Sequence, residues 1–328
     1  MAISIEPTTI GRWSGRSVAA SVVVCTRNRG RRVRSTVASV LRNDWPFELI
    51  VIDQSDDDVT YEGLTSLLDD PRLRYIRSRE RGLSRSRNLG IAEARHELII
   101  MTDDDCVVPP SFVQTMVEEL TMGERVAMVF ADVVEPVSSD LHWTPTNEAH
   151  SDYTVSAVRG WKSNDGVNIG IGAAMGFRKS VVLGVGGFDE QLGAGARYHS
   201  AEDTDIVLRL LLRHHRVHRT TRTWVDHLGA RTVSETRNVI HGAMFGMAVA
   251  SGKLIRHRQW EVVPYFLGVA WLMVIKVGVL EIINGRRPPV LGRSRQLVGG
   301  LIEGLRHPGD RSTLLFRPLE PEVPPSSP

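Results

Sequence analysis

The sequence predicts an α/β fold in which a mostly parallel central sheet is covered by helices on both faces. From residue 20 onward, apolar segments rich in β-branched residues alternate with segments of helical periodicity. The strand-like segments are apolar almost throughout, as expected for strands that are buried on both faces. With 328 residues, 42% of them hydrophobic and 24% charged, the chain is long enough for one large domain with an appendage.

The predicted elements follow one another as strand and helix. Residues 20–29 predict a strand that ends in a polar loop, and residues 31–44 place Val33, Val37 and Val40 at helical spacing. Further strands are predicted at residues 47–53, 72–80, 96–102 and 125–137, and further helices at residues 60–70, 82–95, 111–120 and 201–215. Acidic residues in the first turn of the last helix suit the helix dipole.

Composition divides the chain into four regions. We expect an N-terminal extension at 1–17, the α/β domain at 18–235, a helical segment at 236–310 and a disordered Pro-rich tail at 311–328. The apolar run at 17–26 is short and leads into a basic loop, which favours a first strand over a secretion signal. Two cysteines cannot form a disulfide framework, and we expect a reducing compartment.

Polar side chains gather where the predicted strands end, which is where open α/β sheets bind their ligands. The strand ends supply Thr26, Arg27, Asn28, Asp53, Asp103, Asp104 and Asp105. Neither a Walker loop nor a G-x-G-x-x-G fingerprint follows the first strand. Three adjacent carboxylates behind a buried strand cost free energy unless a cation offsets their charge. A divalent cation site is therefore favoured over a solvated acidic turn.

Six motifs in order give the sequence a clear resemblance. It resembles the family 2 inverting glycosyltransferases, which have the GT-A fold and a DXD motif. The matching segments are SVVVCTRNR, ELIVIDQSDDD, RGLSRSRNLGI, TDDDC, GGFDE and AEDTDIVLRL, between residues 21 and 210. The resemblance implies transfer of a sugar from a nucleoside diphosphate sugar to a hydroxyl group of a glycan or lipid-linked glycan, as in cell-envelope polysaccharide or glycolipid synthesis.

The family also implies roles for individual residues. For nucleotide-sugar binding these are Thr26, Arg27, Asn28, Asp53, Arg85, Arg87, Asn88, Asp103 and Asp104. Arginine suits a diphosphate because its forked donors match phosphate oxygens. At the position after Asp53 the family often has a second aspartate, and this chain has Gln54, which departs from the pattern of base recognition.

The same resemblance implies a divalent cation, Mn²⁺ or Mg²⁺, held by Asp105 with Asp103 and His227 as further ligands. Asp104 stays open as an alternative ligand, because three consecutive aspartates blur the register. The cation would neutralise charge on the leaving diphosphate.

Asp203 is the implied general base, with Glu202 as the second candidate and helix capping as the structural alternative for both. Asp205 lies two residues further along the helix and is expected to be structural. A single base without a covalent intermediate predicts inversion at the anomeric carbon.

Residues 262–283 are long and apolar enough to span a bilayer but contain Lys276 and Glu281. Arginines follow the segment as well as precede it, which conflicts with a single span from a cytoplasmic domain. We favour a helix or hairpin in the cytoplasmic leaflet, with residues 296–305 as a second apolar piece, over a span or a buried core helix. The predicted location is the cytoplasm, at the inner face of the cell membrane, which would suit a lipid-linked acceptor.

Two other functions compete with sugar transfer. A metal-dependent nucleotidyltransferase also uses carboxylates at strand ends, but it would need a Gly-rich basic loop that residues 26–32 resemble only weakly. A basic nucleic-acid-binding module built on Arg27–Arg34 and Arg72–Arg87 leaves the acidic motifs unexplained. A net charge of +2 would also attract the phosphate backbone of a nucleic acid only weakly, so no nucleic-acid partner is expected.

Overall fold

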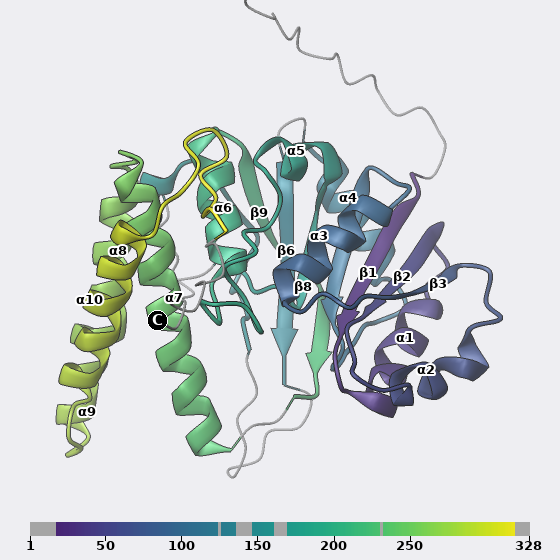
Figure 1. The fold of residues 1–328 in the computed structure, drawn as a ribbon, viewed down its shortest axis with the longest axis horizontal. Helices are drawn as coiled ribbons and strands as arrows, with labels where there is room; N and C mark the ends of the chain where they lie inside the picture. Colours follow the sequence, from purple (N-terminus) through teal and green to yellow (C-terminus); the bar gives the residue numbers. More distant parts are fainter. Residues whose placement is uncertain (1–17, 124–125, 136–145, 161–168, 230–231, 319–328) are drawn as a thin grey trace, which may run out of the picture.

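The described residues 18–123, 126–135, 146–160, 169–229 and 232–318 of a computed structural model form one mixed sheet with helices on both faces (Figure 1). The predicted extension at 1–17 and the end of the tail at 319–328 lie outside them. The strands are β1 (Ala20–Thr26), β2 (Phe47–Asp53), β3 (Leu73–Arg77), β4 (Leu98–Asp103), β5 (Cys106–Val107), β6 (Val126–Val134), β7 (Tyr153–Val155), β8 (Ala174–Arg178) and β9 (Arg216–His227).

The helices follow the predicted alternation in the first half of the chain. They are α1 (Val33–Leu41), α2 (Val59–Leu64), α3 (Leu83–Glu93), α4 (Phe112–Thr121), α5 (Lys179–Gly184), α6 (Glu202–Leu212), α7 (Val233–Arg256), α8 (Val262–Ala270), α9 (Val277–Ile283) and α10 (Val290–Arg306). A π-helical stretch, η4 (Trp271–Lys276), joins α8 to α9, and short 3-10 turns are η1 (Gly30–Arg32), η2 (Thr65–Leu67) and η3 (Val158–Gly160).

The strand order is β3-β2-β1-β4-β8-β6-β9-β5, with β7 paired to β9. The four strands β3, β2, β1 and β4 pair in parallel, as the sequence predicts. Beyond β4 the sheet is mixed, because β8 is antiparallel to both β4 and β6, and β9 is antiparallel to β5 and β7 but parallel to β6. Strands that are not joined by helical crossovers need not be parallel, which explains why the α/β alternation held only for the first half.

Burial on both faces explains the near-continuous apolar strands. In β1, Val22 and Val24 pack into one core beneath α1 and α4, and Val23 packs into the opposite core beneath α3 and α6. Successive residues of a strand point to opposite faces, so both sets must be apolar. This packing fixes the strand ends at which the polar residues lie.

The C-terminal helices lie against one side of this domain. Helix α7 begins with a capping box between Thr232 and Glu235, and it lies between the sheet domain and the pair formed by α8–α9 and α10 (Figure 1). Helices α7 and α10 pack closely at Gly304, which has no side chain. A Cβ at this position would lie only 2.1 Å from the Val249 carbonyl oxygen.

Part of the predicted disordered tail is ordered, which corrects the expectation for residues 311–318. Leu314 and Phe316 are buried at 4% and 5% exposure. The Phe316 N–H donates to Asp189 Oδ2 at 2.8 Å. These two buried apolar side chains hold the segment against the domain, although the Pro-rich composition around it predicted disorder.

Candidate active site

Neighbouring strands bring the predicted polar residues to one edge of the sheet. In the parallel register, Thr26 lies opposite Asp53 and Cys25 lies opposite Asp103. A cavity of about 340 Å³ opens there, and its lining includes Thr26, Arg27, Asp103, Asp104, Asp105 and His227. The structure therefore gathers both proposed donor residues and proposed metal ligands around one space.

The acidic triplet is balanced in part by Arg29, a residue that the sequence analysis did not single out. Arg29 Nε lies 3.2 Å from Asp104 Oδ1, and its Nη2 lies 3.3 Å from Asp105 Oδ2. Burial raises the pKa of Asp104 to about 6 although Arg29 acts in the opposite direction. A cation bound here would stabilise the ionised form of these carboxylates.

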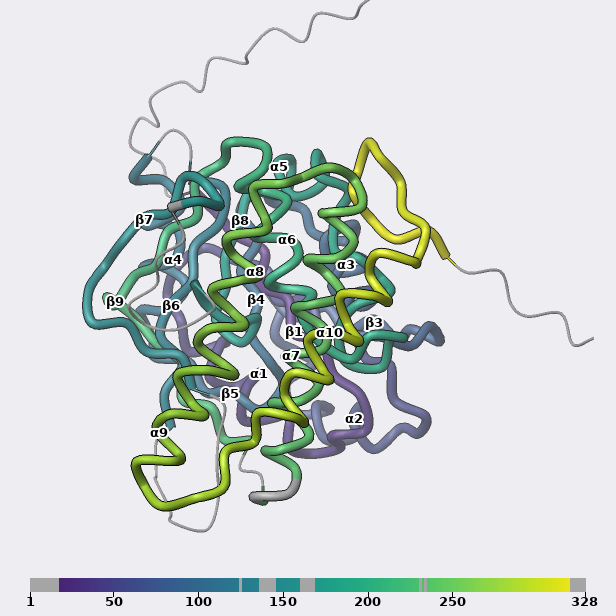
Figure 2. Tube along the Cα trace, turned by 90° about the vertical axis from the view of Figure 1, so that its left-hand side faces the viewer, coloured from purple at the N-terminus to yellow at the C-terminus, as the bar shows by residue number. Residues whose placement is uncertain are grey.

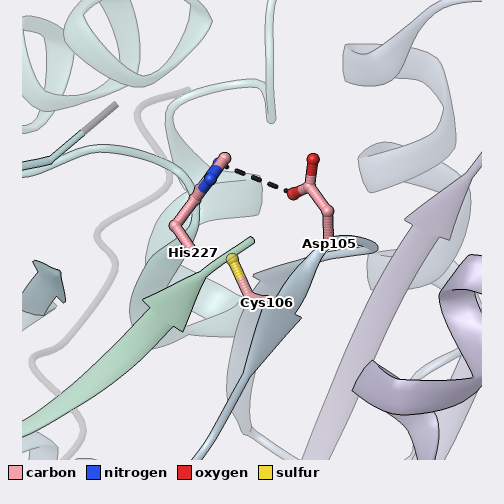
Figure 3. Close-up of side chains that lie close together, drawn as sticks. All are labelled: Asp105, Cys106 and His227. Atoms are coloured by element: carbon pink, nitrogen blue, oxygen red, sulfur yellow. Dashed lines mark ion pairs between the residues drawn. The ribbon is translucent and has the colours of Figure 1, made fainter. Parts of the chain in front are cut away.

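Asp105 and His227 point toward one another across the ends of β5 and β9 (Figure 3). His227 Nε2 lies 3.5 Å from Asp105 Oδ1. The ligand atoms of Asp105, His227 and Cys106 all lie within 4.8 Å of one another. Burial raises the pKa of Cys106, so its thiol stays protonated and is a poor ligand for Mn²⁺ or Mg²⁺.

Gly229 leaves the room that a cation needs beside these two side chains. A Cβ at Gly229 would lie 2.6 Å from Asp105 Oδ2 and 2.5 Å from His227 Cε1. The Asp105 carboxylate offers the oxygen donor that a hard divalent cation prefers, and the His227 imidazole offers a nitrogen donor beside it. Arg29 and Asp105 also line a second cavity, of about 770 Å³.

Asp53 occupies the end of β2 but is completely buried. Its Oδ1 accepts a hydrogen bond from the Ser55 N–H at 2.8 Å, and its Oδ2 accepts one from the Tyr75 hydroxyl at 2.6 Å. Gln54 lines the cavity in its place. The carboxylate thus closes the loop after β2 and does not line the cavity.

Asn28 and Arg27 connect the loops after β1 and β2 through Asp56. Asn28 Nδ2 donates to Asp56 Oδ2 at 3.0 Å, and Asn28 Oδ1 accepts from the Asp56 N–H at 2.9 Å. Arg27 Nη2 lies 3.3 Å from the same carboxylate. Of the two, Arg27 lines the cavity, whereas the Asn28 side chain supports the loop.

Of the predicted binding residues in α3, Asn88 supports a neighbouring turn and Arg85 lies near the surface. Asn88 holds the GGFDE turn, because its Nδ2 donates to the Phe188 carbonyl at 2.9 Å and its Oδ1 accepts from the Phe188 N–H at 2.9 Å. Arg85 lies half-exposed beside Glu190, at 3.3 Å. Neither side chain lines the cavity described above.

Arg87 is the member of α3 that joins the two acidic motifs. The guanidinium is 3% exposed, with Nη1 at 2.8 Å from Glu202 Oε1 and Nη2 at 3.5 Å from Asp103 Oδ1. It therefore links the end of β4 to the start of α6.

Asp203 begins α6 in an environment that suits a general base. Its Oδ1 accepts from the Thr204 N–H at 2.7 Å and its Oδ2 accepts from the Gly172 N–H at 3.1 Å. Burial, followed by the charge of Glu202, raises the pKa of Asp203 to about 7. Glu202 instead holds the ion pair with Arg87, so the geometry favours Asp203 over Glu202 as the base.

The backbone before Asp203 is held in an uncommon conformation. Ala201 has φ of 72° and is buried. A non-glycine residue in this region is strained, and such strain often accompanies a functional site.

A buried ionic network fixes α6 to α7. Lys253 lies 2.6 Å from Asp205 Oδ1 and 2.7 Å from Asp189 Oδ2, and Arg209 Nε lies 2.8 Å from Asp205 Oδ2. Asp205 is thus a structural residue, as expected. Sequence reasoning missed Lys253, which joins the GGFDE turn to α6.

The chain is similar in sequence to known glycosyltransferases. Residues 21–183 match the family described as Glycosyl transferase family 2. A glucosyl-dolichyl phosphate glucuronosyltransferase of Haloferax volcanii is 24% identical over 204 residues, which are 58% of this chain and 62% of that protein. A hyaluronan synthase of Pasteurella multocida is 27% identical over 116 residues, which are 34% of this chain and 12% of that protein.

Solved structures share the fold. A mannosyltransferase from Pyrobaculum calidifontis in complex with GDP-Man and Mn²⁺ superposes with a TM-score of 0.59 at 14% identity, covering 88% of this chain and 87% of that chain. Residues 1–349 of S. aureus TarS in complex with UDP-GlcNAc superpose with a TM-score of 0.58 at 16% identity, covering 88% and 82%. The GT-A architecture that the motifs predicted is confirmed.

Proposed function

Because this chain belongs to glycosyl transferase family 2, we propose that it transfers a sugar from a nucleoside diphosphate sugar to an acceptor hydroxyl with inversion of the anomeric configuration. The observation that carries the proposal is the Arg87 bridge. It joins the acidic triplet at the end of β4 to the motif that holds Asp203. In this proposal, donor binding and proton removal occur on the two sides of one buried guanidinium.

Asp203 is the proposed base. As the acceptor oxygen attacks the anomeric carbon, its proton passes to the Asp203 carboxylate, while the diphosphate departs on the opposite face of the sugar. Backbone N–H groups of Gly172 and Thr204 hold the carboxylate in place. One displacement without a covalent intermediate inverts the configuration.

Asp105 and His227 would hold a Mn²⁺ or Mg²⁺ ion, which supplies charge neutralisation for the leaving diphosphate when bound. We assign donor contacts to Thr26, Arg27, Asp103 and Asp104, since these residues line the cavity. Asp53, Asn28 and Asn88 support the loops around it through the contacts described above.

We further propose a glycan or lipid-linked glycan as the acceptor, at the inner face of the cell membrane. The name of the Haloferax volcanii relative includes a dolichyl phosphate substrate, which supports a lipid-linked acceptor. The free thiols of Cys25 and Cys106 agree with a reducing, cytoplasmic environment.

A panel of nucleotide sugars with Mn²⁺ or Mg²⁺ tests the proposal, scored for donor binding, hydrolysis and transfer. We expect one donor class to bind, and we expect Asp203→Asn to bind it while losing transfer. Binding of no nucleotide sugar, or full transfer by Asp203→Asn, would contradict the assignment. Release of pyrophosphate from a nucleoside triphosphate would instead favour the nucleotidyltransferase alternative.

A further inference from the structure

The apolar segment Val262–Ile283 runs as one helix of 22 residues through α8, η4 and α9, and 17% of its most apolar stretch is buried in the protein. Its buried side consists of Val262, Tyr265, Val269 and Val274, which pack toward the domain. The opposite side exposes Leu267, Trp271, Ile275, Val279 and Ile282, at spacings of three and four residues. Leu267 and Trp271 are each 60% exposed.

Helix α10 adds further exposed apolar side chains beside those of α8–α9. Figure 2 shows α8–α9 and α10 together on the side of the molecule that faces the viewer. The outward residues of α10 are Leu291, Arg295, Val298, Ile302 and Arg306, again at spacings of three and four. We call the exposed apolar side chains of α8–α9 and α10 the apolar face. Contiguous exposed apolar surface of this kind marks an interaction site.

The position of the helix is incompatible with a simple span. The segment is about 33 Å long at about 1.5 Å per residue, which would suit a bilayer crossing. However, it lies along α7 and α10, beside the sheet domain (Figure 1). A crossing in this arrangement would take the flank of the domain into the hydrocarbon, whereas an orientation parallel to the membrane exposes only the apolar face to it.

Arginines lie at both ends of the apolar face. Arg286 and Arg287 are exposed after α9. At the other end, where α7 turns into α8, a cavity of about 550 Å³ is lined by Arg256, His257, Asp310, Arg311, Ser312 and Arg317 among others, so three guanidinium groups accompany one carboxylate. Three guanidinium groups around one cavity favour a phosphate group, because arginine donors match its oxygens.

From these features we propose that the apolar face lies flat on a bilayer that contains anionic phospholipids, and that the arginine-lined cavity receives a phosphate-bearing lipid headgroup. Trp260 and Trp271, at 63% and 60% exposure, occupy positions where an amphipathic ring sits at the headgroup level. Arginines at both ends of the helix then all meet the same negatively charged leaflet. This inference deepens the proposed membrane location by naming the surface, its orientation and the chemistry of its lipid partner.

The buried side of α8 also reaches the active site. Tyr265 is buried in the core, and its pKa is raised by burial and by the charge of Asp203. The helix that meets the lipid is therefore the helix that packs behind the proposed base.

Vesicle co-sedimentation of the full chain tests the inference, with phosphatidylcholine vesicles and with vesicles that also contain phosphatidylglycerol. We expect the wild type to bind the anionic vesicles and to be released by salt. Leu267→Glu with Trp271→Glu should weaken binding about tenfold or more, because two apolar side chains would no longer enter the interface. Met122→Glu, at an equally exposed site on α4 (64%), is the matched control and should bind as the wild type does.

The cavity is tested with Arg311→Glu and Arg317→Glu together. This variant should lose about tenfold in affinity for anionic vesicles while its weak binding to phosphatidylcholine is unchanged. Arg79→Glu together with Arg216→Glu, at exposed positions after β3 and on β9, is the charge-matched control. Equal loss in both vesicle types, or no loss, would contradict the headgroup site.

Failure of the membrane inference is distinguishable from failure of the proposed function, because donor binding is measured on the same proteins without vesicles. A wild type that ignores anionic vesicles would overturn the inference. A dimer in solution that Trp271→Glu dissociates, without vesicle binding, would assign the apolar face to a second copy of the chain. Far-UV circular dichroism and donor binding show that each variant is folded.

Discussion

The guanidinium of Arg87 lies 2.8 Å from the carboxylate of Glu202, and this buried ion pair links α3 to α6. The same guanidinium faces Asp103 at 3.5 Å. One side chain therefore links the acidic triplet at the end of β4 to the acidic motif at the start of α6.

Replacement of Arg87 by Met should impair folding and transfer together. Glu202 would remain buried without its cation, and breaking a buried pair costs about 3–5 kcal/mol. Urea unfolding measures the loss. Arg85→Met, two residues earlier in α3 at a half-exposed position, is the matched control and should change stability by less than about 1 kcal/mol. Equal stability of the two variants would show that the bridge is dispensable.

The rate of transfer should rise with pH and level off near neutrality. A base must be deprotonated, and burial raises the pKa of Asp203 to about 7, so the rate should fall about tenfold per pH unit well below that value. A pH profile of kcat/KM at saturating metal checks this. A rate that is flat from pH 5 to pH 8, from about two units below the pKa of Asp203 to about one unit above it, would remove Asp203 from the role.

The same pKa has an opposite consequence for stability. Because the folded state holds a proton on Asp203 that the unfolded chain loses at lower pH, this group destabilises the fold increasingly as pH rises from about 4 to about 7. Asp203→Asn should therefore unfold at higher urea concentration than the wild type at pH 8 and gain less at pH 4. Asp205→Asn would show the reverse behaviour, a loss of stability, since its carboxylate is paired with Lys253 and Arg209.

Lys253→Met should destabilise the protein by about 3–5 kcal/mol, since it leaves Asp189 and Asp205 buried without their shared ammonium group. Urea denaturation followed by circular dichroism gives the value. Arg216→Met, which removes a charge from an exposed strand position, provides the comparison. A loss no greater than that of Arg216→Met would mean that the network does not hold α7 to α6.

Gly229→Ala should raise the Mn²⁺ concentration needed for half-maximal activity by about tenfold, because the added methyl group would crowd Asp105 and His227. The matched control is Gly184→Ala, where a Cβ meets no atom within 4 Å. Both variants should retain the wild-type circular dichroism spectrum. An unchanged metal requirement in Gly229→Ala would place the cation elsewhere.

Strand ends were predictable from sequence because the apolar runs and the polar residues after them are local signals. Asp103, Asp104 and Asp105 therefore fell where expected, and so did Asp203 at the start of α6. The pairing of β5 with β9, which brings Cys106 opposite His227, joins distant segments and has no local signal. Only the family resemblance pointed to His227.

The residues that sequence reasoning missed act through long-range contacts. Arg29 was one arginine among many in a basic loop, and its two contacts with the acidic triplet depend on how the loop folds back. Lys253 lies in the middle of α7, where its pairing with Asp189 depends on tertiary packing. For Asp53, the Tyr75 hydroxyl on the neighbouring strand decided between ligand contact and loop closure.

The anomeric configuration of the transferred sugar tests the central claim most directly. The product formed from the donor that binds, with Mn²⁺ present, can be assigned from the NMR coupling constant of its anomeric proton. One displacement assisted by Asp203 predicts a product of the opposite configuration to the donor, and predicts that Asp203→Asn forms almost none. A product that keeps the configuration of the donor would contradict this account.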